Sequence, residues 1–375
     1  MEAKFFPIGF DKRKLIQLMM PNEIDGVLLT SPESISYVTG YPCLPSSGNP
    51  VLFAIRNHYP AYAYINNKGE IFLVAWEYSL LDIELGVDHL IKHVNNDQAL
   101  NGLSKLLQTE LGTGKNLGIE TTCPYQITSF IQNWVTPRKL SIVDDIFDQL
   151  RLIKKPDELS HLMKSCQIAE KTLTGLFPLV EPGLKRSELI TAAKEGMIHN
   201  GASGIGHCTI SFGASNPEVE INEVLKKDRL VIIDLGAMYY GYASDIRRTL
   251  YTGFVPEKMG HLHTIMCEIV ETIGNALIPG AKVKDLCNLA ETLYIRNGLE
   301  PNFTHLGHTI GLQTEEVWCD RKNLMKLEPG MVINVELYSM MSSGENIGDE
   351  ETYIVTVGEP ERINQLPKEI RQVIN

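Results

Sequence analysis

The chain has 375 residues, 43% of them hydrophobic, and carries a formal net charge of −12. This length and apolar content fit a folded protein of two domains and exclude a mostly disordered chain. An acidic chain lacks the basic surface that nucleic acids and anionic membranes attract, so neither is an expected partner. No run approaches the ~20 apolar residues that a membrane-spanning helix needs, and the first residues do not form an apolar signal segment. We therefore expect a cytoplasmic protein.

The seven cysteines are an odd number, are widely scattered and include no Cys-x-x-Cys pair. Such a pattern is typical of reduced thiols in a reducing compartment. We expect neither disulfides nor a thiolate metal site.

Residues 1–152 are predicted to form a small α/β domain, because short apolar runs alternate with stretches of helical periodicity. A second domain, 153–375, is expected to start where Pro156 and Asp157 begin an amphipathic helix that runs to about Leu176. The strand candidates of the first domain are 26–30, 51–55, 61–65 and 71–74, and its helix candidates are 11–20, 97–111 and 125–135.

The second domain contains an internal repeat. Residues 182–201 match residues 279–298 at a constant offset of 97, and both copies end in Asn-Gly, a helix C-cap signal. Each copy follows another long helical segment, 156–176 or 256–277, and precedes β-rich sequence. We therefore predict two α-α-β-β halves related by duplication.

Two carboxylates of the first half are predicted to face each other. Asp234 ends the apolar run 230–233, so its side chain must be paired or coordinated. A hairpin that turns between Tyr239 and Tyr240 would set it opposite Asp245, with the two Cβ atoms roughly 5 Å apart. Carboxylates that close repel each other unless a proton or a metal ion lies between them.

The second half repeats this arrangement. A hairpin centred on Ser343 would set Glu336 opposite Glu350, and the duplication would bring the two carboxylate pairs together. Four converging carboxylates are hard oxygen ligands, suited to two divalent ions about 3.5–4 Å apart. His308 would add a neutral imidazole, which favours Mn, Fe, Co or Zn over Mg or Ca, whereas His305 is expected to face the other side of its strand. On the residues alone, a structural cluster of ion pairs without metal stays an alternative.

These residues resemble the pita-bread metallopeptidase superfamily, peptidase family M24, which includes prolidase, aminopeptidase P, methionine aminopeptidase and creatinase. Segments similar to the surroundings of its five metal ligands are 234–236, 241–249, 307–312, 329–336 and 350–352. Residues 25–29 and 35–41 are similar to the creatinase and prolidase N-terminal domain, which methionine aminopeptidases lack. The resemblance implies a creatinase-like N-terminal α/β domain followed by a duplicated pita-bread catalytic domain.

By this resemblance, five residues hold two divalent ions, with Mn favoured among Mn, Co, Zn and Fe. Asp234 would bind one ion, and His308 and Glu336 would bind the other. Asp245 and Glu350 would bind both ions. Glu336 would also act in catalysis by assisting deprotonation of the bridging water.

Two departures from the family pattern bear on the activity. No histidine lies between Phe212 and Ile233, where the peptidases carry one that stabilises the reacting carbonyl. Glu315 stands where a second histidine is expected, seven residues after His308, and an anionic side chain does not stabilise an oxyanion. Glu315 is instead a catalytic candidate as a proton shuttle, or a contact for a cationic substrate.

The predicted function is that of a dinuclear, metal-dependent hydrolase that cleaves Xaa-Pro dipeptides or similar peptide bonds. A creatinase-like or ectoine-hydrolase-like enzyme that acts on a C–N bond of a small amidine or amide is the first alternative. A non-catalytic binding module with the same fold is the second. The expected partners are a dipeptide or other small substrate and, by the resemblance, a second copy of the chain in a homodimer.

Overall fold

The chain forms two compact units, Met1–Arg151 and Leu152–Asn375. The computed structural model describes residues 3–219 and 222–374. Within these residues, none of the helices has both the length and the hydrophobicity that crossing a lipid bilayer requires.

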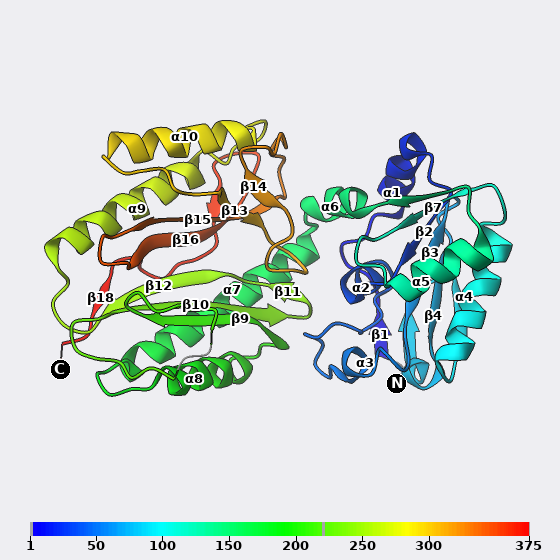
Figure 1. Ribbon diagram of the computed structural model, residues 1–375, viewed down its shortest axis with the longest axis horizontal. Helices are drawn as coiled ribbons and strands as arrows, with labels where there is room; N and C mark the ends of the chain where they lie inside the picture. The colour runs from blue at the N-terminus through cyan, green and yellow to red at the C-terminus, as the bar shows by residue number, and fades with distance from the viewer. Residues whose placement is uncertain (1–2, 220–221, 375) are drawn as a thin grey trace. The chain divides into compact units, whose positions relative to one another are not determined.

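The N-terminal unit is built around a six-stranded mixed sheet (Figure 1). Helix α4 (Asn96–Glu110) packs Leu103 and Leu107 onto this sheet, and neither side chain has exposed surface. The Asn95 side chain caps α4 by accepting a hydrogen bond from the N–H of Gln98. In spatial order the strands are β6 (His89–His93), β4 (Ile71–Trp76), β3 (Tyr62–Asn66), β2 (Gly26–Leu29), β7 (Asn116–Ile119) and β8 (Lys139–Ile142). The other elements are β1 (Ala3–Phe5), α1 (Lys12–Met19), α2 (Pro32–Thr39), α3 (Val51–Ala54), β5 (Ile83–Leu85), α5 (Tyr125–Phe130), the π-helix Ile131–Val135, α6 (Asp144–Leu152) and the short 3₁₀ helices Met20–Asn22 and Glu77–Leu80.

The strand predicted at 51–55 is wrong, because this segment forms the short helix α3. An apolar run of four or five residues has no periodicity that separates a strand from a helix. Pro50 directly precedes α3, and its fixed φ suits a helix start. The other strands and the helices predicted for this domain are confirmed.

The C-terminal unit repeats one arrangement twice, as the internal repeat predicted. Its first half comprises α7 (Pro156–Leu176), the 3₁₀ turn Phe177–Leu179, α8 (Arg186–His199), β9 (Gly204–Phe212), β10 (Leu230–Tyr239), β11 (Tyr242–Ala243) and β12 (Ile246–Tyr251). Its second half comprises α9 (Glu257–Asn275), α10 (Val283–Arg296), β13 (His305–Thr309), β14 (Trp318–Asp320), β15 (Val332–Met340) and β16 (Asn346–Ile354). Two short strands, β17 (Glu361–Arg362) and β18 (Arg371–Gln372), extend the two sheets at β16 and β12.

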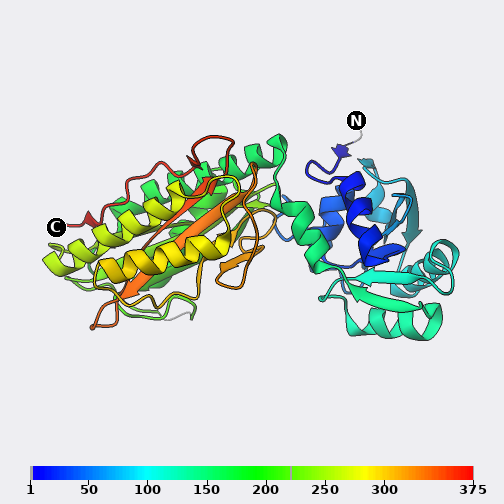
Figure 2. The same ribbon diagram turned by 90° about the horizontal axis from the view of Figure 1, so that it is seen from above.

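Each sheet is covered on one face by the helices of its own half. Figures 1 and 2 show α7 and α8 against β10 and β9, α9 over β15 and β16, and α10 on the side of β13 and β14. In β10, Ile233 and Leu235 are fully buried in the core beneath α7 and α8, and in β15 Val335 and Leu337 are buried beneath α9 and α10. Because side chains alternate between the faces of a strand, the acidic residue between each pair is directed to the face away from the helices. The two sheets meet where β12 lies beside β16.

The predicted register of the second hairpin is confirmed, because Glu336 of β15 pairs directly with Glu350 of β16. The predicted register of the first hairpin is wrong, because Asp234 pairs with Arg247 and not with Asp245. The turn residues Tyr240 and Gly241 both have positive φ, of 45° and 90°. That is the geometry of a two-residue type I′ turn, so the turn comes one residue later than predicted.

A buried ion pair ties the segment between α6 and α7 to the loop that follows β13. The Nζ atom of Lys154 lies 2.8 Å from Oε2 of Glu316, and the two side chains are 1% and 3% exposed. The other carboxylate oxygen of Glu316 accepts a hydrogen bond from the N–H of Leu312. The two oxygens of Glu316 therefore hold the loop that follows His308, one through Lys154 and the other through the backbone of Leu312.

Removing one partner of this pair leaves a buried charge uncompensated, so Lys154→Met is expected to lower the free energy of unfolding by about 3–5 kcal/mol. Lys171, which is exposed on α7, provides the matched control, and Lys171→Met is expected to change stability by less than about 0.5 kcal/mol. Urea unfolding of both variants measures the difference. Equal stability of the two variants would contradict a structural role for the pair.

Candidate metal centre

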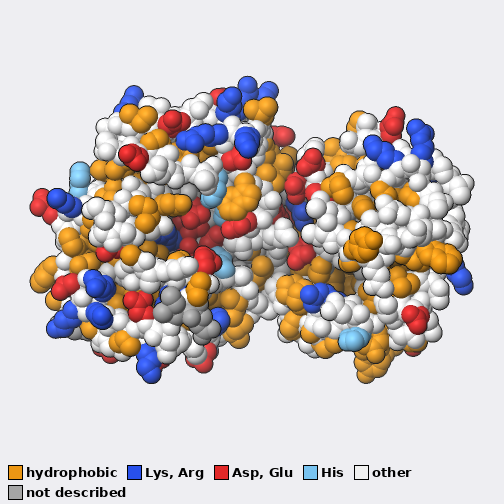
Figure 3. All heavy atoms as spheres, viewed as in Figure 1, with side chains coloured by type: hydrophobic (Ala, Val, Ile, Leu, Met, Phe, Trp, Pro, Cys, Tyr) orange, Lys and Arg blue, Asp and Glu red, His pale blue; other side chains and the backbone are white. Residues whose placement is uncertain are grey.

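Four carboxylates and a histidine from both halves gather on the helix-free faces of the two sheets. Glu350, Asp245 and His308 are buried, with exposed fractions of 1%, 5% and 1%. Asp234 and Glu336 are half-buried. Figure 3 shows Asp, Glu and His side chains gathered in a recess of the C-terminal unit. The structure therefore brings together all five residues that the sequence predicted as metal ligands.

Asp245 reaches this cluster by a route that the sequence did not predict. It lies between β11 and β12, outside the regular ladder that pairs Asp234 with Arg247. Its Oδ2 atom is 3.5 Å from Nε2 of His308. Burial disfavours its charged form, but the nearby imidazoles of His207 and His308 hold the pKa of Asp245 well below its usual range.

Two groups of possible ligand atoms share Asp245. In one group, donor atoms of Asp245, His308 and Glu350 all lie within 4.8 Å of one another, and in the other those of His207, Asp234 and Asp245 do. Cation sites that share a carboxylate suit two ions held close together. Glu336 is in neither of these groups and lies across from Glu350 in the strand pair.

The two glutamates are placed where their charged forms are unfavourable. Burial and the charges of Asp234 and Asp245 raise the pKa of Glu336 to about 7. Burial and the same two aspartates raise the pKa of Glu350 well above its usual range. The Oε2 atom of Glu350 is buried and finds no hydrogen-bond partner among the residues that the structure describes. A cation among these carboxylates would remove the repulsion and satisfy the open oxygen, so the residues present fit a metal centre.

Neighbouring polar groups hold Glu350 in place. The side-chain amide of Asn334, two residues before Glu336 on β15, donates a hydrogen bond to Oε1 of Glu350. Asn334 accepts a hydrogen bond of 2.9 Å from the hydroxyl of Thr352. These two hydrogen bonds fix the orientation of the Glu350 carboxylate before any ion binds.

His207 belongs to the cluster, although it was not predicted from the sequence. Its Nε2 atom lies 2.9 Å from Oδ1 of Asp234 and 3.0 Å from Oδ1 of Asp245. Burial disfavours the charged imidazole, but Asp245 and Asp234 raise the pKa of His207 well above its usual range. The sequence alone contains no local signal for this position. Only the pairing of β9 with β10 shows that His207 and Asp234 lie on the same face of the sheet.

Two other predicted residues lie at the edge of the cluster. The side chain of Glu315 is exposed, and its charge is among those that act on His308. Burial lowers the pKa of His308, but Asp245, Glu336 and Glu315 offset this effect and raise it. His305 lies three residues before His308 on β13, and its ring packs against Trp318 with the ring centroids 4.2 Å apart.

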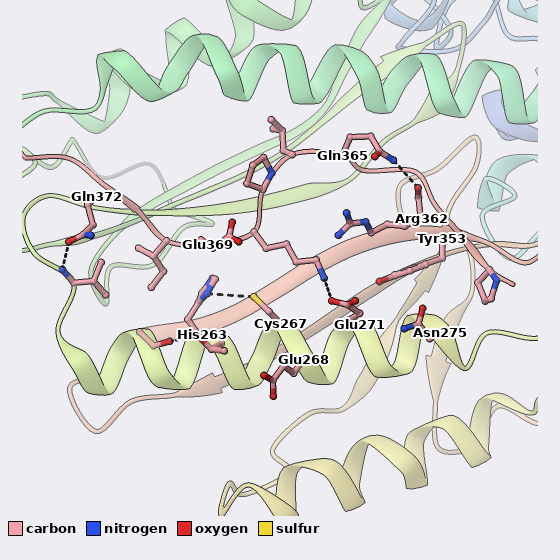
Figure 4. A pocket seen from close by; sticks show the side chains of 18 residues that line it. His263, Cys267, Glu268, Glu271, Asn275, Tyr353, Arg362, Gln365, Glu369 and Gln372 are labelled. Carbon is pink, nitrogen blue, oxygen red and sulfur yellow. Dashed lines mark hydrogen bonds and ion pairs between the residues drawn. The ribbon is translucent and has the colours of Figure 1, made fainter.

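A separate cavity of about 960 Å³ lies between α9 and the segment 360–372 (Figure 4). Tyr353 of β16 lines it, and because Tyr353 is three residues from Glu350, the two side chains lie on opposite faces of the strand. His263 and Cys267 of α9 also line it, with Sγ 3.5 Å from Nδ1. Burial raises the pKa of the Cys267 thiol, which keeps it protonated and unreactive. This cavity is distinct from the carboxylate cluster.

The comparisons with known proteins cover both units. Residues 160–357 match the model of metallopeptidase family M24, and residues 12–153 match that of the creatinase/prolidase N-terminal domain. The Xaa-Pro dipeptidase of Pyrococcus horikoshii is 27% identical over 369 residues, which cover 96% of this chain and 97% of the relative. The crystal structure of the prolidase from Pyrococcus horikoshii OT3 superposes with a TM-score of 0.83 at 25% identity, covering 96% of this chain and 99% of that chain.

The same fold also occurs in the N-terminal domain of a FACT complex subunit from Cicer arietinum, with a TM-score of 0.75 at 16% identity over 95% of this chain and 96% of that chain. The fold alone therefore does not establish a reaction. The family model adds what the fold cannot, since it spans more than half of the chain and contains all five predicted ligands. The family resemblance and the predicted fold class are thus confirmed. The chain belongs to metallopeptidase family M24 and is a metal-dependent hydrolase of that family.

Proposed function

We propose that this chain is a dinuclear Xaa-Pro dipeptidase whose two divalent ions are held by Asp234, Asp245, His308, Glu336 and Glu350. The observation that carries the proposal is the pair of ligand groups that share Asp245. The Xaa-Pro dipeptidases among its relatives, which match nearly the whole chain, support the substrate class. When bound, the ions would polarise the scissile carbonyl and lower the pKa of a water molecule. Mn is the favoured metal among Mn, Co, Zn and Fe.

Glu336 is the proposed proton acceptor. In the metal-free protein its pKa lies near 7, and bound ions would lower it, so the loaded centre would hold Glu336 in the ionised form that accepts a proton. It pairs across the strands with the buried Glu350, but it keeps some exposure, so a substrate entering the recess could reach it. Glu350 is held by Asn334 and has no such freedom.

Glu315 is the proposed second catalytic group. An exposed carboxylate beside the histidine ligand can carry a proton between the leaving amine and solvent. It cannot stabilise an oxyanion while ionised. The same carboxylate would attract a cationic substrate, and this favours, as second candidate, hydrolysis of a C–N bond in a small amidine or amide.

Three further properties are proposed. A homodimeric state and the choice of Mn over the other three metals rest on the resemblance. A cytoplasmic location rests on the acidic composition and the lack of a long apolar run in the sequence. They bear on the conditions for an assay. The activity tests are therefore best run with each of the four metals.

The substrate is tested by proline release from Ala-Pro and Leu-Pro by protein reloaded with Mn, Co, Zn or Fe, with creatine as the amidine alternative. We expect cleavage of the dipeptides that is abolished by a chelator. Asp245→Asn, which keeps the size of the side chain, is expected to lower kcat/KM at least about 100-fold, because one residue serves both ligand groups. Bound metal with no dipeptide cleavage would contradict the Xaa-Pro assignment, and creatine cleavage would support the second candidate.

Proton transfer by Glu315 is tested with Glu315→Gln. We expect kcat for Ala-Pro to fall by roughly 100-fold with little change in KM, because the lost group acts on the proton and not on binding. Glu328→Gln, at an exposed position further along the chain, is the control and is expected to match the unmodified protein. Unchanged kcat in Glu315→Gln would remove Glu315 from the mechanism.

The metal-free protein is expected to lose stability as pH rises from about 4.5 to 7. Folded Glu336 keeps its proton up to about pH 7, whereas the unfolded chain releases it near the ordinary value of 4.5, so the folded state binds more protons across this window. The raised pKa of His207 acts in the same direction above pH 6.5. Divalent ions need the deprotonated ligands, so the gain in Tm on adding metal should grow over the same range.

Thermal unfolding with and without Mn at pH 5 and pH 7.5 measures this linkage. Glu336→Gln serves as the matched variant, because it lacks the titrating group and should show a smaller dependence on pH. A gain in Tm that is the same at both pH values would contradict the account.

A further inference from the structure

We infer that His207 is itself a metal ligand, so that the ion held by Asp234 and Asp245 also binds Nε2 of this imidazole. The inference rests on the proposed metal centre and adds a sixth residue to it. It gives each of the two ligand groups one histidine, His207 in the first and His308 in the second.

The distances fit one shared ion. Nε2 of His207 lies 2.9 Å from Oδ1 of Asp234 and 3.0 Å from Oδ1 of Asp245. Neighbouring ligands of a six-coordinate ion at about 2.1 Å from each donor are themselves roughly 3 Å apart. Both imidazole–carboxylate distances therefore match the spacing of adjacent positions around one cation, and all three donor atoms lie within 4.8 Å of one another.

The strand pairing directs the imidazole to this position. His207 of β9 pairs with Gly236 of β10, and Thr209 pairs with Asp234. Cross-strand partners share a face, so the side chains of His207 and Asp234 lie on the same face as diagonal neighbours. The register shifts between Gly236 and Ala237, so a bulge lies directly beyond the histidine before the pairing resumes.

Gly236 provides the space that the ring occupies. A Cβ atom at this position would lie 2.6 Å from Cε1 and 2.7 Å from Nδ1 of His207, and would also collide with the carbonyl oxygen of Ser244. Any larger residue at 236 would push the imidazole away from both aspartates. The absence of a side chain at Gly236 therefore leaves room for the His207 ring next to both aspartates.

A second imidazole changes which metal the centre prefers. Imidazole nitrogen suits Co, Zn and Fe, whereas carboxylate oxygen alone suits Mn and Mg. With His207 bound, Co and Zn should bind more tightly than Mn at the position formed with Asp234 and Asp245. This departs from the preference for Mn that the family resemblance implies.

The test uses the full chain loaded with Co(II). Imidazole N–H protons of cobalt ligands give paramagnetically shifted proton NMR signals that exchange with solvent, so two such signals are expected in water and neither in D₂O. Calorimetric titration of the metal-free protein should show two Co(II) ions per chain. His207→Gln is expected to lose one signal and to weaken one of the two ions at least about tenfold, with the other unchanged.

His199→Gln is the control, because His199 is exposed at the end of α8 and belongs to neither ligand group. It should keep both signals and both affinities. If His207→Gln does not fold, the number of signals in the unmodified protein decides the question alone.

The outcomes separate the two proposals. Absence of any bound Co(II) would overturn the metal centre itself. Two bound ions with a single exchangeable signal would leave the metal centre intact and overturn the role of His207. One bound ion in the unmodified protein and two in His207→Gln would show that the imidazole replaces an ion, which would also overturn the inference.

Discussion

Electrostatic repulsion among four carboxylates is the constraint on which the rest of this structure depends. Asp234, Asp245, Glu336 and Glu350 converge at a place where water cannot screen all of them, because two of the four are almost completely buried. In the absence of a cation, burial together with this repulsion raises the pKa of Glu336 and of Glu350. A folded chain that keeps this cluster needs protons, imidazoles or metal ions to neutralise it, and the family to which it belongs uses metal ions.

The duplicated architecture explains how the cluster is assembled and supported. Each half contributes acidic residues from one hairpin, and alternation along the strand sends the apolar neighbours into the core beneath the helices. The opposite face of β16 also carries a buried carboxylate, but an arginine compensates its charge. Glu351, next to Glu350, is neutralised by Arg248 at 2.8 Å, with both side chains essentially buried. Glu351 is thus paired with a permanent protein cation and has a structural role, whereas Glu350 on the other face is free to bind an exchangeable ion.

Much of the fold and part of the site could be predicted from the sequence. Glu336 and Glu350 were paired correctly, because the Ser/Gly-rich turn between them is symmetric about Ser343. The pairing of Asp234 failed, since a bulky Tyr240 with positive φ is not visible as a turn residue in a sequence. His207 was missed because its place depends on the register of β9, which pairs with β10 across a long connection. Local patterns thus determined the elements, and long-range register determined the site.

The assignment to family M24 rests on the family match, and the metal centre rests on the converging ligands. The substrate is a separate question, because an exposed Glu315 stands where the resemblance expects a histidine.

The most direct measurement is an anomalous difference map from crystals grown with Co(II) and collected above the cobalt edge. The account predicts two peaks in the C-terminal unit, one among His207, Asp234 and Asp245 and the other among Asp245, His308 and Glu350. A map without a peak among these residues, from protein shown to be folded, would contradict the central claim.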